Sequence, residues 1–189
     1  MYLSAYADYL MVITPPESII KEVGRYKRAS VNVIGHFEGM YSCAQIIVTR
    51  QVRCKPFFGE PAIERMAGGL QTMPPIELKI NGFGFFDESQ TAKTIYALIE
   101  RTDKTDKWFR LLMKQMGIKV KGFVPHIVIA KNIPLTSFNK LWANFDNRVF
   151  SETFTVNSLT VLHRETFVEY CEWRVYKELL FASRLTVAF

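Results

Sequence analysis

The chain has 189 residues, of which 49% are hydrophobic, 14% are aromatic and 22% are charged. This length favours a single domain with a sizeable core, and the aromatic content excludes a mainly disordered protein. The formal net charge of +6 favours anionic partners such as phosphates or nucleic acid, although the basic residues are spread along the whole chain.

The three cysteines, Cys43, Cys54 and Cys171, form no CxxC pair and leave an odd number. This pattern indicates neither a disulfide framework nor a zinc site, and it is typical of reduced thiols. The N-terminal segment lacks a basic region, and its apolar run is too short and too polar for a signal peptide or a membrane helix. We therefore expect a cytoplasmic protein that does not span a membrane, and no motif calls for a metal or a cofactor.

In chain order, the first predicted element is a strand at 5–13. A helix follows, which Thr14 is expected to cap and Gly35 to end with a left-handed residue. The short apolar segment at 43–48 is then predicted to be a buried strand.

A second helix is predicted to begin at Pro61 and to stop before Pro74, because proline fits the first turn of a helix but not its interior. Alternating apolar residues predict a strand at 76–86. Gly82 and Gly84 within this strand indicate a bulge or a close approach of backbones.

The second half of the sequence repeats the order strand, helix, strand, helix, strand and adds a last strand. The predicted elements are a strand at 93–100, a helix capped by Asp103 and ending before Gly117, a strand at 124–130, a helix at 137–145, and strands at 154–162 and 167–179, the last two paired as a hairpin around 164–166. The repeated order predicts an α+β fold for residues 1–189, in which two βαβαβ halves form lobes at about 1–90 and about 91–189. A pseudo-twofold would place 43–48 and 124–130 opposite each other across a central groove, a common place for a ligand.

The sequence VPHIVIA at 124–130 resembles the second signature of the two-histidine (2H) phosphoesterases, which carry two copies of His-x-Thr/Ser. Pro125, His126, Ile129 and Ala130 fit that signature. The segments YLMVITPPESI, INGFGFF and FTVNSLTVLHRE also resemble this superfamily, which includes 2′-5′ RNA ligase-like proteins. The resemblance implies a bilobal fold with antiparallel sheets around a central groove, and a phosphodiester ligand such as an RNA end or a nucleotide.

In that family the two histidines act as general acid and general base on a phosphodiester without a metal, and the two hydroxyl groups hold its oxygens. Residues i and i+2 of a strand share a face at about 6.6 Å, so histidine and hydroxyl reach one phosphate together. Here Gln45 takes the first histidine position and Ile47 its hydroxyl position, while Val128 replaces the second hydroxyl. Glutamine can hydrogen-bond but cannot titrate, so catalysis is expected to be weak or lost.

His126 is therefore the predicted catalytic residue, and the predicted substrate-binding residues are Gln45, Arg50 and Lys131. Each has an alternative role. His126 can be a core histidine bonded to backbone, Gln45 can be a buried amide, and the basic residues can belong to solvated loops. His36 is expected at the surface or in a cap, and His163 is assigned no chemistry. The rings of FGFF at 83–86 could stack on bases, but core packing is expected for at least two of them.

Three functions are compatible with these residues. The first is a 2H-type enzyme acting on 2′-5′ or 2′,3′-cyclic phosphodiesters with His126 as its one proton-transfer group. The second is a protein that keeps the groove and binds a nucleotide, RNA end or other phosphorylated ligand without catalysis. The third is a structural or partner-binding module that uses another surface. A monomer is expected in each case.

Overall fold

The structure is a computed structural model that describes residues 6–119, 122–168 and 171–181. These residues form four helices and eight strands. In chain order they are β1 (Ala7–Ile13), α1 (Glu17–Ile34), β2 (Ile46–Cys54), α2 (Pro56–Leu70), β3 (Ile76–Asp87), β4 (Ala92–Ile99), α3 (Asp103–Gln115), β5 (His126–Pro134), α4 (Leu135–Trp142), β6 (Ser151–Val156), β7 (Ser158–Glu165) and β8 (Arg174–Leu180).

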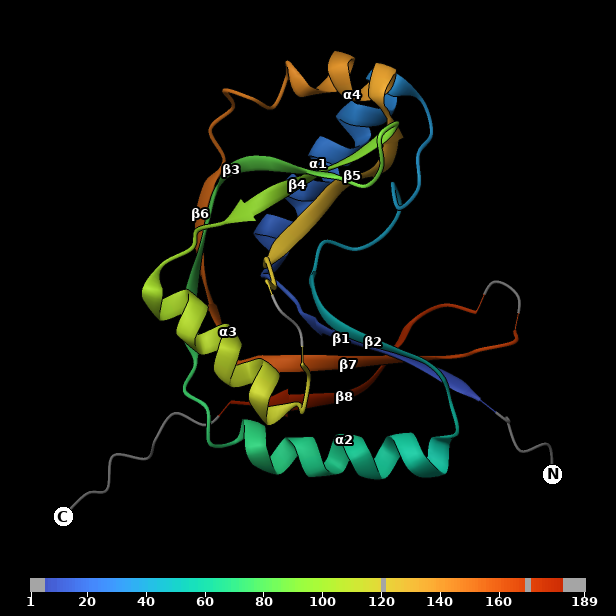
Figure 1. Ribbon diagram of the computed structural model, residues 1–189, viewed down its shortest axis with the longest axis vertical. Helices are drawn as coiled ribbons and strands as arrows, with labels where there is room; N and C mark the ends of the chain where they lie inside the picture. The colour runs from blue at the N-terminus through green and yellow to red at the C-terminus, as the bar shows by residue number, and fades with distance from the viewer. Residues whose placement is uncertain (1–5, 120–121, 169–170, 182–189) are drawn as a thin grey trace.

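The strands form two antiparallel sheets, which we call the first and second sheets (Figure 1). The first has the order β2-β1-β7-β8, and the second has the order β5-β4-β3-β6. Neighbouring strands run antiparallel in both sheets. The predicted α+β fold with two antiparallel sheets is thereby confirmed.

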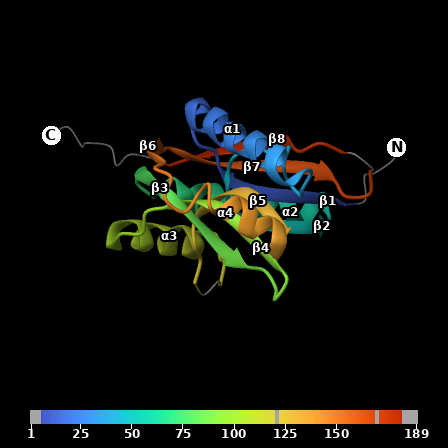
Figure 2. The same cartoon turned by 90° about the horizontal axis from the view of Figure 1, so that it is seen from above.

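The helices cover the outer faces of the sheets. Helix α2 lies below the first sheet (Figure 1), where Gly59 comes so close to the Tyr9 ring that a Cβ atom would stand 2.8 Å from it. Helices α1 and α4 pack against each other and against β5 of the second sheet. Seen from above, α1 and α3 lie on opposite sides of the strands (Figure 2).

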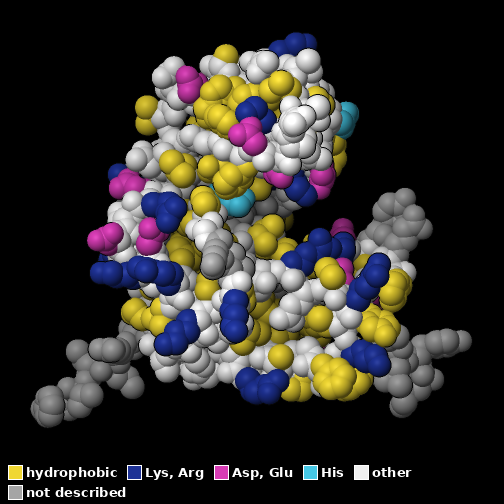
Figure 3. Space-filling view, viewed as in Figure 1, with side chains coloured by type: hydrophobic (Ala, Val, Ile, Leu, Met, Phe, Trp, Pro, Cys, Tyr) yellow, Lys and Arg dark blue, Asp and Glu magenta, His cyan; other side chains and the backbone are white. Residues whose placement is uncertain are grey.

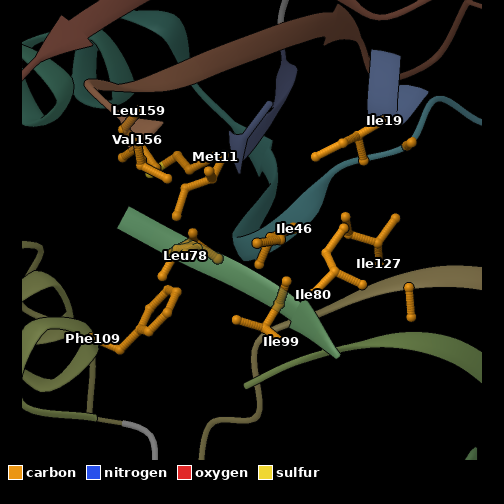
Figure 4. Packing of buried hydrophobic residues seen from close by; sticks show 14 of the residues in the cluster. Met11, Ile19, Ile46, Leu78, Ile80, Ile99, Phe109, Ile127, Val156 and Leu159 are labelled. Carbon is orange, nitrogen blue, oxygen red and sulfur yellow. The ribbon is translucent and has the colours of Figure 1, made fainter. Parts of the chain in front are cut away.

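One hydrophobic core joins the two sheets where their edge strands β2 and β5 meet. Figure 4 shows Ile46 of β2 and Ile127 of β5 gathered with Ile80 and Ile99, and all four side chains are fully buried. Burying such a side chain is worth about 1.5–3 kcal/mol, so this contact fixes β2 next to β5.

The two sheets do not follow the predicted division of the chain near residue 90. Strand β3 belongs to the second sheet, whereas β7 and β8, from the end of the chain, complete the first sheet beside β1. The predicted strand at 154–162 is in fact two strands in different sheets, separated at Asn157. The buried apolar residues change from even positions (Phe154, Val156) to odd positions (Leu159, Val161) across Asn157. This change of phase marks a break in the strand, but it does not show that the chain passes to the other sheet. The single domain stays a prediction.

Several predicted boundaries were also wrong. Thr14 does not cap α1, whose N-cap is Pro16, and Thr14 Oγ1 instead lies 3.5 Å from Thr160 Oγ1. Helix α2 begins at Pro56 and contains Pro61, because the earlier proline takes the first turn.

Three further predicted boundaries also differ from the structure. Thr102 rather than Asp103 caps α3, by accepting a hydrogen bond from the N–H of Thr105. Strand β2 begins at Ile46 and extends to Cys54, well beyond the strand predicted at 43–48. The predicted last strand at 167–179 is shorter as observed, and its residues 169–170 lie outside the described part of the chain.

The two glycine signals predicted the backbone more reliably than the cap and boundary signals did. Gly35 ends α1 with a φ of 76°, as its position indicated. The predicted bulge in β3 is confirmed, since Gly82 has a φ of 77° and the register to β4 shifts between Ile80 and Phe83. Among the described helices, none is both long and apolar enough to cross a membrane.

Candidate phosphate-binding groove

His126 is the first residue of β5 and is partly buried. Its Nδ1 lies 2.7 Å from the carbonyl oxygen of Val124. Because a carbonyl oxygen only accepts, Nδ1 carries the hydrogen, and Nε2 of the neutral ring is left as an acceptor. Burial lowers the pKa of His126 below its ordinary value of 6.5, although the Val124 hydrogen bond and the charge of Glu88 act in the other direction. The ring is therefore neutral near pH 7.

Two aromatic rings lie beside His126. Phe86 stacks on Tyr96 with ring centroids 4.2 Å apart, and both rings contact the imidazole, at 4.9 Å and 5.1 Å respectively. Gly84 makes this arrangement possible, because a Cβ atom there would stand 2.8 Å from the Tyr96 ring. Of the FGFF rings, Phe83 packs against the core, whereas Phe85 contacts Phe138 but is 39% exposed, so core packing holds for Phe83 and not for Phe85. Phe86 is the ring nearest to the site.

Gln45 stands immediately before β2 and is partly buried. It and Ile47 alternate with Ile46, which points into the core, so Gln45 and Ile47 lie on the opposite face of the strand. On β5, His126 and Val128 likewise alternate with the buried Ile127. Since β2 and β5 are in contact, the two motif strands lie side by side and direct their motif residues away from the shared core.

The loop that leads to Gln45 is held by a buried lysine. Lys27 of α1 donates hydrogen bonds from Nζ to the carbonyl oxygens of Gly39 (3.0 Å) and Ser42 (2.8 Å), and to Oγ of Ser42 (2.8 Å). Its side chain is only 3% exposed, and burial lowers its pKa to about 8. Helix α1 thus fixes the segment that precedes β2.

Arg50 lies on the same face of β2 as Gln45 and Ile47, because it pairs in register with Leu10 and Ile47 pairs with Val12 of β1. Its Nη2 is 3.6 Å from Oδ2 of Asp8, and its side chain is 49% exposed.

Asp8 is a buried carboxylate that connects three strands of the first sheet. Its Oδ1 accepts hydrogen bonds from the backbone N–H of Arg53 (3.0 Å) and the hydroxyl of Thr166 (2.9 Å). Its Oδ2 accepts from Nε and Nη2 of Arg164 (3.1 and 3.0 Å). Burial raises the pKa of Asp8, but these hydrogen bonds outweigh it and leave the pKa below its ordinary value. The carboxylate therefore stays charged and fixes Arg164.

Lys131 has a different environment from Arg50. It forms an ion pair with Glu38 and an isolated β-bridge with the same residue. The ion pair attaches the loop before β2 to β5 and partly neutralises the charge of Lys131, although the side chain remains about half exposed.

The remaining histidines lie elsewhere. His36 is exposed just beyond α1, as expected. His163 pairs in register with Tyr9, and so lies on the face of the first sheet that α2 covers. Among the residues the structure describes, no group of His, Cys, Asp and Glu side chains has the arrangement of a metal site.

Figure 3 shows a hollow between the part of the molecule that carries β4 and β5 and the part that carries β1 and β2, and Lys and Arg side chains gather along its lower edge. A separate cavity of about 830 Å³ lies between α3 and residues 117–119 and 122–125, and it reaches Pro125 next to His126.

The sequence did not single out Asp8, Arg164, Trp173 or Tyr96. Asp8 was detectable in principle, as a lone charge inside the otherwise apolar strand ADYLMVI, because a buried charge needs partners. Arg164 carried no comparable signal, since its contact with Asp8 arises only when β7 pairs with β1. Trp173, whose ring lies 4.7 Å from the Arg164 guanidinium, likewise carried none.

Residues 48–166, more than half of the chain, match the 2′-5′ RNA ligase superfamily. The chain belongs to this superfamily. The resemblance to the 2H phosphoesterases is confirmed, and no curated protein matches the chain significantly. The matched range includes His126, Arg50 and Lys131 and begins just after the motif position of Gln45.

Solved structures agree with this membership. E. coli LigT complexed with 3′-AMP aligns with a TM-score of 0.65 at 11% identity, over 94% of this chain and 99% of LigT. TT0787 of Thermus thermophilus gives 0.64 at 15% identity, over 94% and 99%. Usb1 of Kluyveromyces marxianus gives 0.52 at 8% identity, over 95% and 100%. At these identities the likeness shows that the superfamily fold extends over nearly the whole chain.

Proposed function

We propose that this member of the 2′-5′ RNA ligase superfamily binds a nucleotide or RNA-end phosphodiester in the groove beside β2 and β5, with one phosphate held by Gln45 and His126. The observation that carries the proposal is the placement of these two residues at equivalent points of two neighbouring edge strands, both partly buried and both turned from the core. Crystal structures of E. coli LigT with 3′-AMP, NADP+ and ATP add support for a nucleotide ligand.

The residues in the two motifs favour binding over efficient catalysis. Neutral His126 has one acceptor nitrogen, Nε2, which takes up one proton before it can donate a hydrogen bond to a phosphate oxygen. Gln45 can donate an amide N–H to a phosphate oxygen but cannot supply a proton to a leaving group. A positioned acid or base typically contributes about 10²–10⁴ in rate, so losing one of the pair removes a factor of that size. Ile47 and Val128 provide no hydroxyl group for the phosphate oxygens.

The aromatic rings next to His126 suit a nucleoside. Phe86 is partly buried and stands at 4.9 Å from the imidazole ring. A base attached to a phosphate at His126 can stack against such a ring, which contributes about 1–3 kcal/mol without selecting a particular base.

A second candidate function is an enzyme that cleaves 2′,3′-cyclic or 2′-5′ phosphodiesters with His126 as its single base. The Nδ1 contact with Val124 favours it, because it presents Nε2 in the unprotonated form that a base requires. This candidate differs from the first in that product must form with repeated turnover.

Calorimetric titration with 3′-AMP and with 2′,3′-cyclic AMP tests the proposal, and chromatography of the same mixtures detects turnover. His126→Ala and Gln45→Ala are each expected to weaken binding at least about tenfold, which corresponds to one charge-assisted hydrogen bond. His36→Ala, an exposed histidine outside the groove, serves as the matched control and is expected to bind like the wild type. Equal affinity in the wild type and both groove variants would refute the proposal. Turnover that disappears in His126→Ala would establish the enzyme instead.

A further inference from the structure

Arg50, Arg164 and Trp173 form a group at the outer part of the first sheet, which we call the arginine–tryptophan cluster. Both guanidinium groups lie over the Trp173 ring, at 5.8 Å (Arg50) and 4.7 Å (Arg164) from its centroid. The aromatic face attracts cations and holds the planar guanidinium groups in place.

The two arginines are bound differently. Arg164 donates two hydrogen bonds to Asp8, whereas Arg50 approaches Asp8 only to 3.6 Å and is 49% exposed. Both oxygens of Asp8 already accept hydrogen bonds from Arg53, Thr166 and Arg164. Two guanidinium charges therefore face one saturated carboxylate, and among the described residues no closer acceptor takes the donors of Arg50, which leaves them available to an anion.

The cluster lies on the same face of the sheet as the proposed phosphate site. Arg50 pairs with Leu10, and Leu10 pairs with Leu162, while α2 covers the opposite face at Tyr9. Along β2, Arg50 is five residues beyond Gln45, which corresponds to roughly 16 Å at about 3.3 Å per residue. At this backbone separation, two phosphates of one chain fit Gln45 and Arg50 better than a single phosphate does.

We propose that the arginine–tryptophan cluster is a second phosphate subsite, and that the groove takes an oligonucleotide whose chain continues from Gln45 and His126 toward Arg50. This inference rests on the proposed phosphodiester site and extends it along β2. The Trp173 ring helps to hold the planar Arg50 guanidinium in place, and its N–H groups can bind a backbone phosphate in the bidentate manner that lysine cannot provide.

The test compares a mononucleotide with a short RNA. Affinities for 3′-AMP and for a hexa-adenylate ending in a 3′-phosphate are measured by calorimetry and fluorescence anisotropy at several salt concentrations. The variants are Arg50→Ala, Arg50→Lys and, as a matched control, Arg65→Ala, an exposed arginine on α2. Thermal unfolding of each variant confirms that the fold is kept.

Arg50→Ala is expected to weaken hexanucleotide binding about tenfold and to reduce the slope of log K against log salt by about 0.7, the value for one phosphate of a single strand. Its affinity for 3′-AMP should change less than twofold. Arg50→Lys should fall between the wild type and Arg50→Ala, and Arg65→Ala should match the wild type.

The possible failures are distinguishable. If Arg50→Ala weakens both ligands equally, or neither, the second subsite is overturned while the proposed function stands. If the wild type binds the hexanucleotide through Arg50 but does not bind 3′-AMP, the subsite is supported and the site at Gln45 and His126 is overturned. If the wild type binds neither ligand, both proposals are overturned.

Discussion

Replacing Asp8 by alanine should destabilise the fold much more than replacing an exposed aspartate. The side chain is 3% exposed and accepts hydrogen bonds from Arg53, Thr166 and Arg164. Loss of the acceptor for the Arg53 N–H, which sits in a bulge between β1 and β2, costs about 1–3 kcal/mol. The Arg164 ion pair adds only about 0–1 kcal/mol, because that side chain is 32% exposed and water can replace the carboxylate. We expect a total loss of about 1–4 kcal/mol.

The same substitution should change the dependence of stability on pH. The pKa of Asp8 is lower in the folded protein than in the unfolded chain, so the unfolded chain binds more protons at acidic pH. The stabilisation is complete above the unfolded pKa of about 3.9 and is lost as the pH falls through the lower, folded pKa. The difference between the wild type and Asp8→Ala should therefore shrink below about pH 4.

Urea denaturation followed by tryptophan fluorescence measures both effects, at pH 7 and at steps down to about pH 3. Asp87→Ala is the matched control, since Asp87 is 69% exposed and its ion pair in the described part of the chain is with Lys93. It should cost less than about 0.5 kcal/mol. A loss below about 0.5 kcal/mol in Asp8→Ala, or an equal loss at every pH, would contradict the role assigned to this carboxylate.

Three further predictions concern the groove. Gly84→Ala should displace the Tyr96 ring, because the new Cβ would stand 2.8 Å from it, and should cost about 1–3 kcal/mol in urea denaturation; an unchanged midpoint would show that the ring moves freely. Burial lowers the pKa of Lys27 to about 8, so between about pH 8 and 10.5 the unfolded chain binds more protons at this lysine than the folded protein does. The free energy of unfolding should therefore rise with pH over this window in the wild type but not in Lys27→Met. Restoring the family motifs should raise cleavage of 2′,3′-cyclic AMP about 10²–10⁴-fold over the wild type, and no gain would mean that the two strands do not share a phosphate. The substitutions for this last test are Gln45→His, Ile47→Thr and Val128→Thr.

The sequence alone determined most elements of this fold, because their signals are local. The strand at 76–87, the glycine that ends α1 and the bulge at Gly82 each follow from a few neighbouring residues. The family signature around His126 was also local. It pointed correctly to the superfamily. With the pseudo-twofold it also predicted that the strand of Gln45 faces the strand of His126, and the contact between β2 and β5 agrees with this prediction.

Only the tertiary structure decided which strands share a sheet and which charges meet. The alternation of apolar residues changes phase at Asn157, which marks a break in the strand, but the break does not show that the chain leaves the second sheet for the first. Asp8 and Arg164 are 156 positions apart, and they meet because β7 pairs with β1. Pairing between distant strands depends on the burial of both partners together, and no short stretch of sequence contains that information.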